Sequence, residues 1–326
     1  MKTLLVSIVT GAALGVSAVP AAAQDFPTRP VTMVVPFSAG GPTDIVARTL
    51  AAAMEKPLGG PAIIVENKPG AGGTIAAADV ARAQPDGYRL LIHHIGMSTQ
   101  PTLYRKLSYD AINDFQPIAL INEVPMTIVT KADFPAKDFK ELLSYVKQNS
   151  AKITLANAGI GAASHLCGLM FMTAIDRQLT PVPYKGTAPA LTDLMGGQVD
   201  LMCDQTTNTT QQIKSGKIKA YAVTSAERLA TFPDLPTAKE SGLPTLQIGI
   251  WHALYAPKGT PKAVVDKLVA AVQAGLTDPS LQKRFADLGA VMYPKAQQTP
   301  DGVATKLKAE IEQWAPIIKK AGVYAD

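Results

Sequence analysis

The chain has 326 residues, of which 47% are hydrophobic and 17% are charged, and its 31 lysines and arginines face 26 acidic residues. This small basic excess is scattered instead of forming tracts with interleaved aromatic residues, which argues against a nucleic-acid-binding protein. After a leader is removed, about 300 residues remain, enough for two lobes of about 100–150 residues with sizeable cores.

The N-terminus, residues 1–23, has the pattern of a cleaved signal peptide. Lys2 precedes the apolar stretch Leu4–Val19, and Ala21–Ala23 matches an A-x-A cleavage site before Gln24. No later segment approaches the roughly 18 uninterrupted apolar residues of a membrane helix. The sequence predicts an exported, soluble protein without membrane insertion of the mature chain.

Strands and helices alternate in the first part of the mature chain. The expected elements are strands Val31–Val35, Ala62–Glu66 and Tyr88–Ile92, with helices Asp44–Met54 and Thr74–Ala83 between them. Such alternation predicts parallel pairing in an open, doubly wound sheet. Ligands on such sheets bind beyond the carboxyl ends of the strands, so we expect three loops at one edge: Phe37–Thr43, Asn67–Gly73 and His93–Thr99.

The middle of the chain predicts a second α/β lobe. Two apolar strands, Pro117–Ile121 and Met126–Thr130, come first. The alternation then starts again, with helices Lys137–Gln148, Ser164–Ile175, Ala188–Met195 and Asn208–Lys214 and strands Ile153–Ala156, Leu179–Tyr184, Val199–Cys203 and Ile218–Thr224. The expected fold class is therefore α/β with two lobes, each a mixed, mostly parallel sheet flanked by helices.

The last part of the chain holds one more predicted strand, Leu246–Ala256, followed only by helices: Pro261–Gly275, Ser280–Leu288 and Gly302–Lys320. Helices without strands of their own need a sheet to cover, so we assign this tail to the first lobe. The first lobe then comprises residues 24–123 and 249–326, and the second 124–248. Crossings near Asn122–Val124 and Gln247–Ile250 would form a hinge around a cleft.

A glycine pair between the first strand and the first helix is the most informative motif. It lets the backbone turn tightly, so that the N–H groups of the helix N-terminus point at a bound anion. Because the chain has no P-loop and no G-x-G-x-x-G fingerprint, a carboxylate or small oxyanion fits better than a nucleotide. An ordinary strand-to-helix turn is the alternative. The candidate ligand contacts are Phe37, Ser38, Ala39, Gly40, Gly41, Thr43 and Asp44.

A second strand, glycine loop and helix start follow in Ile153–His165. If the lobes face each other, two helix N-termini converge on one cavity, which suits a carboxylate ligand. A histidine near a helix start is often only a local structural partner. The candidate contacts here are Gly161, Ala162, Ser164 and His165.

Further candidates lie at the same predicted edge. Lys185 is a plausible counter-charge and Tyr184 an apolar wall, although the lysine also fits a solvated turn. Asp204 could hold an ammonium or hydroxyl group, or simply cap the next helix. One residue of the pair His93-His94 is expected to line the pocket, and we name His94.

Catalytic and metal sites are not predicted. Ser38 is outside a G-x-S-x-G elbow, and Cys167 and His165, two apart on a helix, do not face each other. Adjacent histidines on a strand point to opposite faces, so His93 and His94 cannot share one metal ion. We expect no enzyme activity, no cofactor and no metal.

The cysteines, Cys167 and Cys203, leave two alternatives. An oxidising compartment permits a disulfide, provided that the Cα atoms lie within about 7 Å, which the sequence does not fix. Otherwise they are two small buried apolar side chains.

A series of motifs resembles the Bug/TctC family, the extracytoplasmic solute receptors of tripartite tricarboxylate transporters. Each motif is weak alone, but the series covers the mature chain in order. The matching segments are Pro36–Asp44, Asn67–Gly73, Pro85–Tyr88, Gly159–Leu166, Val182–Gly186, Gly197–Asp200, Ala222–Ser225, Pro233–Thr237 and Ala256–Pro261.

The resemblance implies a monomeric periplasmic binding protein of the type II-like, Venus flytrap kind. It would capture an organic mono-, di- or tricarboxylate and present it to membrane permease subunits. Many members have Ser or Thr where this chain has Ala162, so Ser164 or the Ala162 N–H would serve instead.

Other classes and ligands stay open. The alternatives are an exported α/β enzyme acting on a carboxylated substrate and an exported sensor subunit with a signalling partner. An aromatic acid could pack on Phe37, Tyr184 and Trp251, whereas an amino acid could place its ammonium on Asp204.

Overall fold

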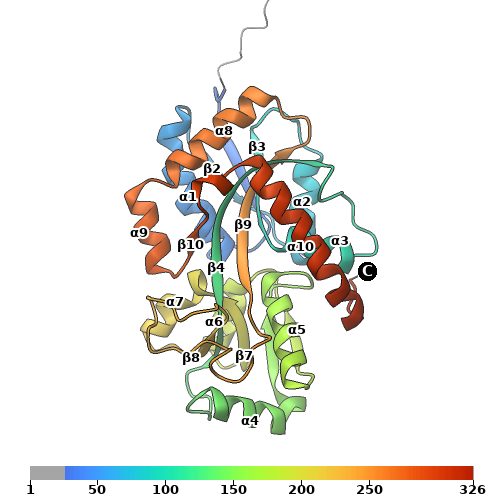
Figure 1. The fold of residues 1–326 in the computed structure, drawn as a ribbon, viewed down its shortest axis with the longest axis vertical. Helices are drawn as coiled ribbons and strands as arrows, with labels where there is room; N and C mark the ends of the chain where they lie inside the picture. The colour runs from blue at the N-terminus through green and yellow to red at the C-terminus, as the bar shows by residue number, and fades with distance from the viewer. Residues whose placement is uncertain (1–25, 326) are drawn as a thin grey trace, which may run out of the picture.

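The computed structural model describes residues 26–325, so the predicted signal peptide lies outside the described residues. The fold is α/β, with two lobes stacked along the long axis of the molecule (Figure 1). Strands of both lobes join one curled sheet in the order β2-β1-β3-β9-β4-β7-β5-β6, with β10 and β8 added at β4.

The first lobe begins as the sequence predicts. Buried β1 pairs in parallel with β2 and β3, and the connecting helices pack on the sheet. The elements are β1 (Val31–Val35), α1 (Pro42–Leu58), β2 (Ile63–Asn67), α2 (Thr74–Ala81), β3 (Arg89–His94) and α3 (Gly96–Leu103).

Helix α3 replaces most of the loop expected at His93–Thr99, so that part of the expectation was wrong. Its sequence favours turns, but the Ser98 hydroxyl donates to the Ile95 carbonyl at 2.6 Å and the helix packs against the C-terminal helix. Tertiary packing thus stabilises a helix that local preference does not predict.

A single long strand, β4 (Phe115–Lys131), connects the lobes where two strands were expected. Its first part, to Pro125, pairs antiparallel with β9 (Gly249–Pro257), and from Met126 it pairs antiparallel with β7 and β8. Pro125 has no N–H to donate to a neighbouring strand, and it lies where the pairing partner changes. The backbone therefore stays extended from one lobe into the other.

The second lobe repeats the parallel arrangement. Strand β5 pairs in parallel with β6 and β7. The elements are α4 (Phe139–Asn149), β5 (Thr154–Asn157), α5 (Ala163–Ile175), β6 (Thr180–Pro183), α6 (Thr187–Met195), β7 (Leu201–Gln205), α7 (Thr206–Lys214) and β8 (Ile218–Val223).

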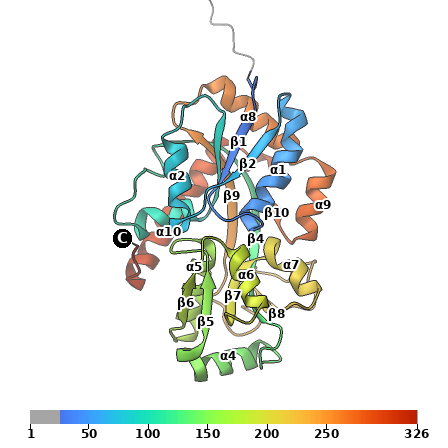
Figure 2. The same cartoon turned by 180° about the vertical axis from the view of Figure 1, so that it is seen from behind.

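The C-terminal segment returns to the first lobe, where α8 (Lys262–Gly275) packs on α1 and α10 (Pro300–Ala321) packs on α3 and β4 (Figure 2). Between them lie α9 (Pro279–Asp287) and a two-residue strand, β10 (Val291–Met292), which pairs with β4. The expectation of helices only was wrong at β10, because two residues carry no periodic signal.

A disulfide joins Cys167 on α5 to Cys203 on β7, with the Cα atoms 5.9 Å apart. Both cysteines are buried. The bridge therefore ties the first turns of α5 to the end of the strand beside it.

Replacing both cysteines by alanine is expected to lower the free energy of unfolding by about 2–4 kcal/mol, because the bridge joins residues 36 apart and constrains the unfolded chain. Urea titration followed by circular dichroism measures this. Wild-type protein unfolded in a thiol reductant is the control and should approach the variant. Equal urea midpoints for oxidised wild type and variant would contradict the expectation.

Candidate functional site

Four helix N-termini, those of α1, α5, α6 and α7, border one cavity between the lobes. Its walls are Phe37, Pro42, Thr43, His94, Ala158, Ala162, Ala163, Ser164, Thr187, Asp204 and Gln205. The cavity has a volume of about 10 Å³, which is room for about one water molecule. The cavity is therefore closed tightly between the lobes.

None of these four helices has a side-chain cap. Their N-cap residues are Gly41, Ala162, Gly186 and Gln205, and no side chain at these positions accepts a hydrogen bond from the first turn. By contrast, α4, α9 and α10 begin with side-chain caps from Asp138, Asp278 and Thr299. The uncapped ends leave N–H donors and positive dipole ends directed at one cavity.

The glycine loop before α1 is held by Asp44 from inside the first lobe. The Asp44 carboxylate accepts hydrogen bonds from the Gly40 N–H at 2.8 Å, the Asn67 amide at 2.8 Å and Arg48 Nε at 2.9 Å. Asp44 therefore shapes the loop and does not line the cavity, whereas Thr43 does.

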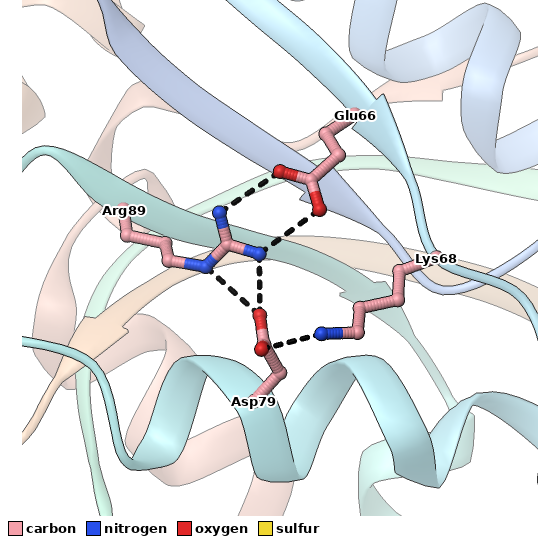
Figure 3. Close-up of polar contacts among 4 residues, drawn as sticks. All are labelled: Glu66, Lys68, Asp79 and Arg89. Atoms are coloured by element: carbon pink, nitrogen blue, oxygen red, sulfur yellow. Dashed lines mark hydrogen bonds and ion pairs between the residues drawn. The ribbon is translucent and has the colours of Figure 1, made fainter.

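An ion-pair cluster joins the two strands that pair with β1, the strand that precedes this loop (Figure 3). Arg89 on β3 binds Glu66 on β2 through two hydrogen bonds of 2.9 and 3.0 Å and also contacts Asp79 on α2, which pairs with Lys68. The hydrogen bonds from Arg89 are the main reason that the pKa of Glu66 is lowered. The cluster connects β2, β3 and α2 around the segment that holds Asn67.

The glycine loop before α5 leaves one hydroxyl for a ligand. The Ala162 N–H donates to the Gly159 carbonyl at 3.1 Å and so is already used. Ser164 Oγ accepts from the Ala158 N–H at 2.9 Å, which leaves the Ser164 hydroxyl proton free to donate. Of the two groups considered for the departure at Ala162, the Ala162 N–H thus has a partner within its own loop, and the Ser164 hydroxyl proton does not have one in the described chain.

His165 turns away from the central cavity. Its Nδ1 accepts from the Gly161 N–H at 3.3 Å, and it lines a second cavity, together with Leu155 of β5 and Pro181 of β6. Burial lowers the pKa of His165 to about 4.

Asp204, at the end of β7, is a buried carboxylate on the cavity wall, only 1% exposed. It accepts from the Gln205 N–H at 2.9 Å and from the Asn208 amide at 2.5 Å. Burial raises its pKa to about 6, although these hydrogen bonds oppose the shift.

Buried histidines form the wall behind the α1 loop. His94 stacks on Phe37, with ring centroids 4.7 Å apart, and lines the cavity. His252 lies between Asn122 at 3.0 Å and the Thr43 hydroxyl at 3.4 Å. Burial lowers the pKa of His93 and His252 to about 3 and that of His94 well below its usual value, so all three are neutral at pH 7.

The described chain contains no group of three or more histidine, cysteine or acidic residues arranged to hold a metal ion. The contacts of the imidazoles are stacking, as for His94 on Phe37, and hydrogen bonding, as for His252 with Asn122.

The remaining predicted residues lie away from the wall of the central cavity. The Tyr184 hydroxyl donates to Asp193, and Tyr184 and Lys185 border an outer hollow beside Gly72. Trp251 is fully buried in the core, so it offers no surface to an aromatic ligand. The predicted residues that do not line the cavity are Ser38, Ala39, Gly40, Gly41, Asp44, Gly161, His165, Tyr184 and Lys185.

The cavity also has walls that sequence reasoning missed: Pro42, Ala158, Ala163, Thr187 and Gln205. Two signals were present in the sequence. Gly186 comes directly before the first residue of α6, and Gln205 ends a buried strand directly before α7. The helices α6 and α7 themselves were predicted, and applying the strand–turn–helix rule to every junction would also have placed their N-termini at the cavity.

Hydrogen bonds across the cleft hold the lobes together. The Ser38 N–H donates to the Lys185 carbonyl at 3.2 Å, and the Tyr104 hydroxyl lies 2.9 Å from the Ile160 carbonyl. Gly72 packs so closely that a Cβ there would be 1.9 Å from the Ile160 oxygen. Closure therefore requires a residue without a side chain at Gly72.

Two lobes with a closed cavity between them, lined by helix N-termini, are the architecture of a solute-binding protein. The family model described as "Tripartite tricarboxylate transporter family receptor" matches residues 46–323. The chain belongs to this family. None of the helices within residues 26–325 is both long and apolar enough to cross a bilayer.

Relatives and solved structures agree with this assignment. A protein of Agrobacterium vitis named "UPF0065 protein in the TAR-I ttuE-ttuC' intergenic region" is 50% identical over 303 residues, 93% of this chain and 87% of that protein. The periplasmic binding protein BugD is 58% identical with a TM-score of 0.90, covering 92% of this chain and 100% of that one. MatC of Rhodopseudomonas palustris, solved with bound malate, is 44% identical with a TM-score of 0.87, covering 90% and 100%.

The variant Gly72→Ala is expected to prevent full closure, because its methyl group would collide with the Ile160 carbonyl. Small-angle X-ray scattering should show a larger radius of gyration than for wild type. Gly197→Ala is the matched control, because Gly197 has a similar φ of +72° but no atom within 4 Å of an added Cβ. The same radius for Gly72→Ala and the control would contradict the expected collision.

Stability is expected to fall as the pH drops from 7.5 to 5.5. All four histidines have folded-state pKa values below the unfolded value of about 6.5, so the unfolded chain binds more protons there. Each imidazole accounts for a loss of about 1 kcal/mol between pH 7.5 and 5.5, because its contribution is fully present above pH 6.5 and falls steadily below it. Asp204, whose pKa is raised to about 6, contributes in the opposite direction, but it is one group against four. Urea titrations measure the slope, which should be shallower in His165→Gln. An unchanged slope in that variant would show that His165 does not titrate in this way.

Proposed function

We propose that this protein is an exported receptor that binds a small organic carboxylate between its lobes and delivers it to the permease subunits of a tripartite transporter. The convergence of four uncapped helix N-termini on one cavity carries the proposal, because such ends bind anions through N–H groups and dipoles. Malate bound to the relative MatC supports the same ligand class.

The carboxylate contacts we propose are the first turns of α1 and α5, with Thr43 and Ser164 adding hydroxyl groups. Each dipole contributes about 0.3–1 kcal/mol, and up to about 2 kcal/mol when partly buried, so hydrogen bonds supply most of the affinity. The closed cavity is too small for an organic acid, so the lobes must separate to admit one.

The lobe boundaries of the proposal are residues 24–123 with 249–326, and 124–248, with the hinge at β4 and the start of β9. The change of pairing partner between Pro125 and Met126 supports this division. A ligand bridging both lobes stabilises closure by the difference between its affinities for the closed and open states. The permease would then recognise the closed form.

The receptor performs no chemistry on its ligand in this proposal. Within residues 26–325, Ser164 and His165 form no hydrogen bond to each other, and His165 lines a different cavity. The mature chain is proposed to be a periplasmic monomer after removal of residues 1–23, with no cofactor.

Organic acids that bind are expected to raise the melting temperature, since a ligand at 100 times its dissociation constant adds about 2.7 kcal/mol of stability. A thermal-shift screen against mono-, di- and tricarboxylates, malate included, measures this. Gly41→Trp should abolish the shift, because a Cβ at Gly41 lies 3.3 Å from the Ser38 oxygen and 3.9 Å from the Ala188 nitrogen of the facing lobe.

Gly196→Trp is the matched control, because Gly196 is exposed and has a similar φ of −81° against −79° for Gly41. A full shift in Gly41→Trp would rule out the α1 cradle. Mass spectrometry of the recovered ligand tests the absence of chemistry, and a converted ligand would favour an enzyme.

A further inference from the structure

Helix α7 carries three hydroxyl groups that are buried without a hydrogen-bond partner. Thr206, Thr207 and Thr210 are at most 3% exposed, and within residues 26–325 none of their Oγ1 atoms has a hydrogen-bond partner. Thr210 lies three positions after Thr207 and four after Thr206, so the three side chains share one face of the helix. Buried polar atoms in folded proteins almost always have partners, so three unpaired hydroxyls on one face need an explanation.

Two other polar side chains of α7 are bonded within the second lobe. The Thr209 hydroxyl lies 2.9 Å from the Thr127 hydroxyl on β4 and 3.3 Å from the Gln205 carbonyl. The Asn208 amide donates to the Asp204 carboxylate at 2.5 Å. The helix therefore pairs the polar groups that face its own lobe and leaves the hydroxyls of its other face unpaired.

The unpaired face lies toward the first lobe. Helix α7 packs on α1 and lies at the boundary between the lobes in both views (Figures 1 and 2). A Cβ added at Gly289 of the first lobe would be 3.4 Å from Thr206 Oγ1.

A second contact between the lobes repeats this pattern. The Oγ atom of Ser38, in the loop before α1, is buried without a partner among the described residues, and a Cβ added at Gly186 of the facing lobe would collide with it. Unpaired hydroxyls thus lie at two places where the closed lobes touch.

Closure removes water from such hydroxyls without giving them a new partner, which destabilises the closed form relative to the open form. The apparent dissociation constant of a ligand that needs the closed form is its intrinsic value divided by the fraction of molecules in that form. A group that destabilises the closed form therefore weakens binding without touching the ligand.

We propose that Thr206, Thr207 and Thr210 set the affinity of the receptor from outside the cavity, because their unpaired hydroxyls keep the ligand-free lobes apart. None of the three lines the cavity. This inference rests on the proposed function, in which the lobes separate to admit an acid, and it names the residues that set the balance between the open and closed forms.

Replacing all three threonines by valine tests the proposal, because valine has nearly the same shape and a similar helix propensity but no hydroxyl. Protein is first freed of bound acids by unfolding in urea, dialysis and refolding. Small-angle X-ray scattering should then give a smaller radius of gyration for the triple variant than for wild type, because loss of the hydroxyls favours closure. Equal radii would overturn the proposal.

Thr192→Val is the matched control. Thr192 is exposed on α6 of the same lobe, where its hydroxyl donates to the Ala188 carbonyl, and the variant should keep the wild-type radius. Thr209→Val removes a paired hydroxyl and should lower the melting temperature, whereas the triple variant should melt at or above the wild-type temperature. If the triple variant fails to fold, Thr206→Val alone should shift the radius in the same direction by a smaller amount, and an unchanged radius would overturn the proposal.

Isothermal titration calorimetry with malate, and with the acid that gives the largest shift in the thermal screen, measures the effect on affinity. The dissociation constant should be at least about threefold lower in the triple variant than in wild type and unchanged in Thr192→Val. A smaller radius without tighter binding would overturn the role in affinity. If no acid binds wild-type protein, the proposed function is contradicted, whereas the radii of the acid-free proteins still decide whether the hydroxyls keep the lobes apart.

Discussion

The unpaired N–H groups at four helix starts are the constraint on which this structure depends. A helix N-terminus needs acceptors, and helices elsewhere in the chain obtain them from side chains such as Asp138 and Thr299. The four helices at the cavity have glycine, alanine or an unbonded glutamine there instead. The N–H groups of their first turns are thus available to a molecule that enters between the lobes.

The surroundings of the cavity keep these donors effective. Burial leaves the nearby imidazoles uncharged, so they stack and accept hydrogen bonds without competing for an anion. The Asp44 carboxylate accepts hydrogen bonds from the Gly40 loop, and the cluster around Arg89 joins the two strands that pair with β1. Asp204 is the exception, because its carboxylate reaches the cavity wall without a counter-charge. The cavity therefore has helix N-termini, which favour negative charge, on several walls and a carboxylate on another.

Much of the fold was predictable because local signals agreed with the tertiary arrangement. The strands and helices around Gly40 and Gly161 lie where hydrophobic periodicity and turn residues place them. The continuous strand through Pro125 was not predictable, since a proline inside a strand normally indicates an interruption. The helix after His94 and the short strand at Val291 depend on packing against segments distant in sequence.

The sequence alone determined that two strand–glycine–helix junctions exist and that the chain has the motifs of a receptor, because those features are local. Only the tertiary structure decided which junction residues reach the cavity, since side-chain direction depends on packing between lobes. It turned Asp44 and His165 toward their own lobes and brought Thr187 and Gln205 to the wall. It also placed Cys167 beside Cys203, 36 residues apart, at a distance that no spacing rule specifies.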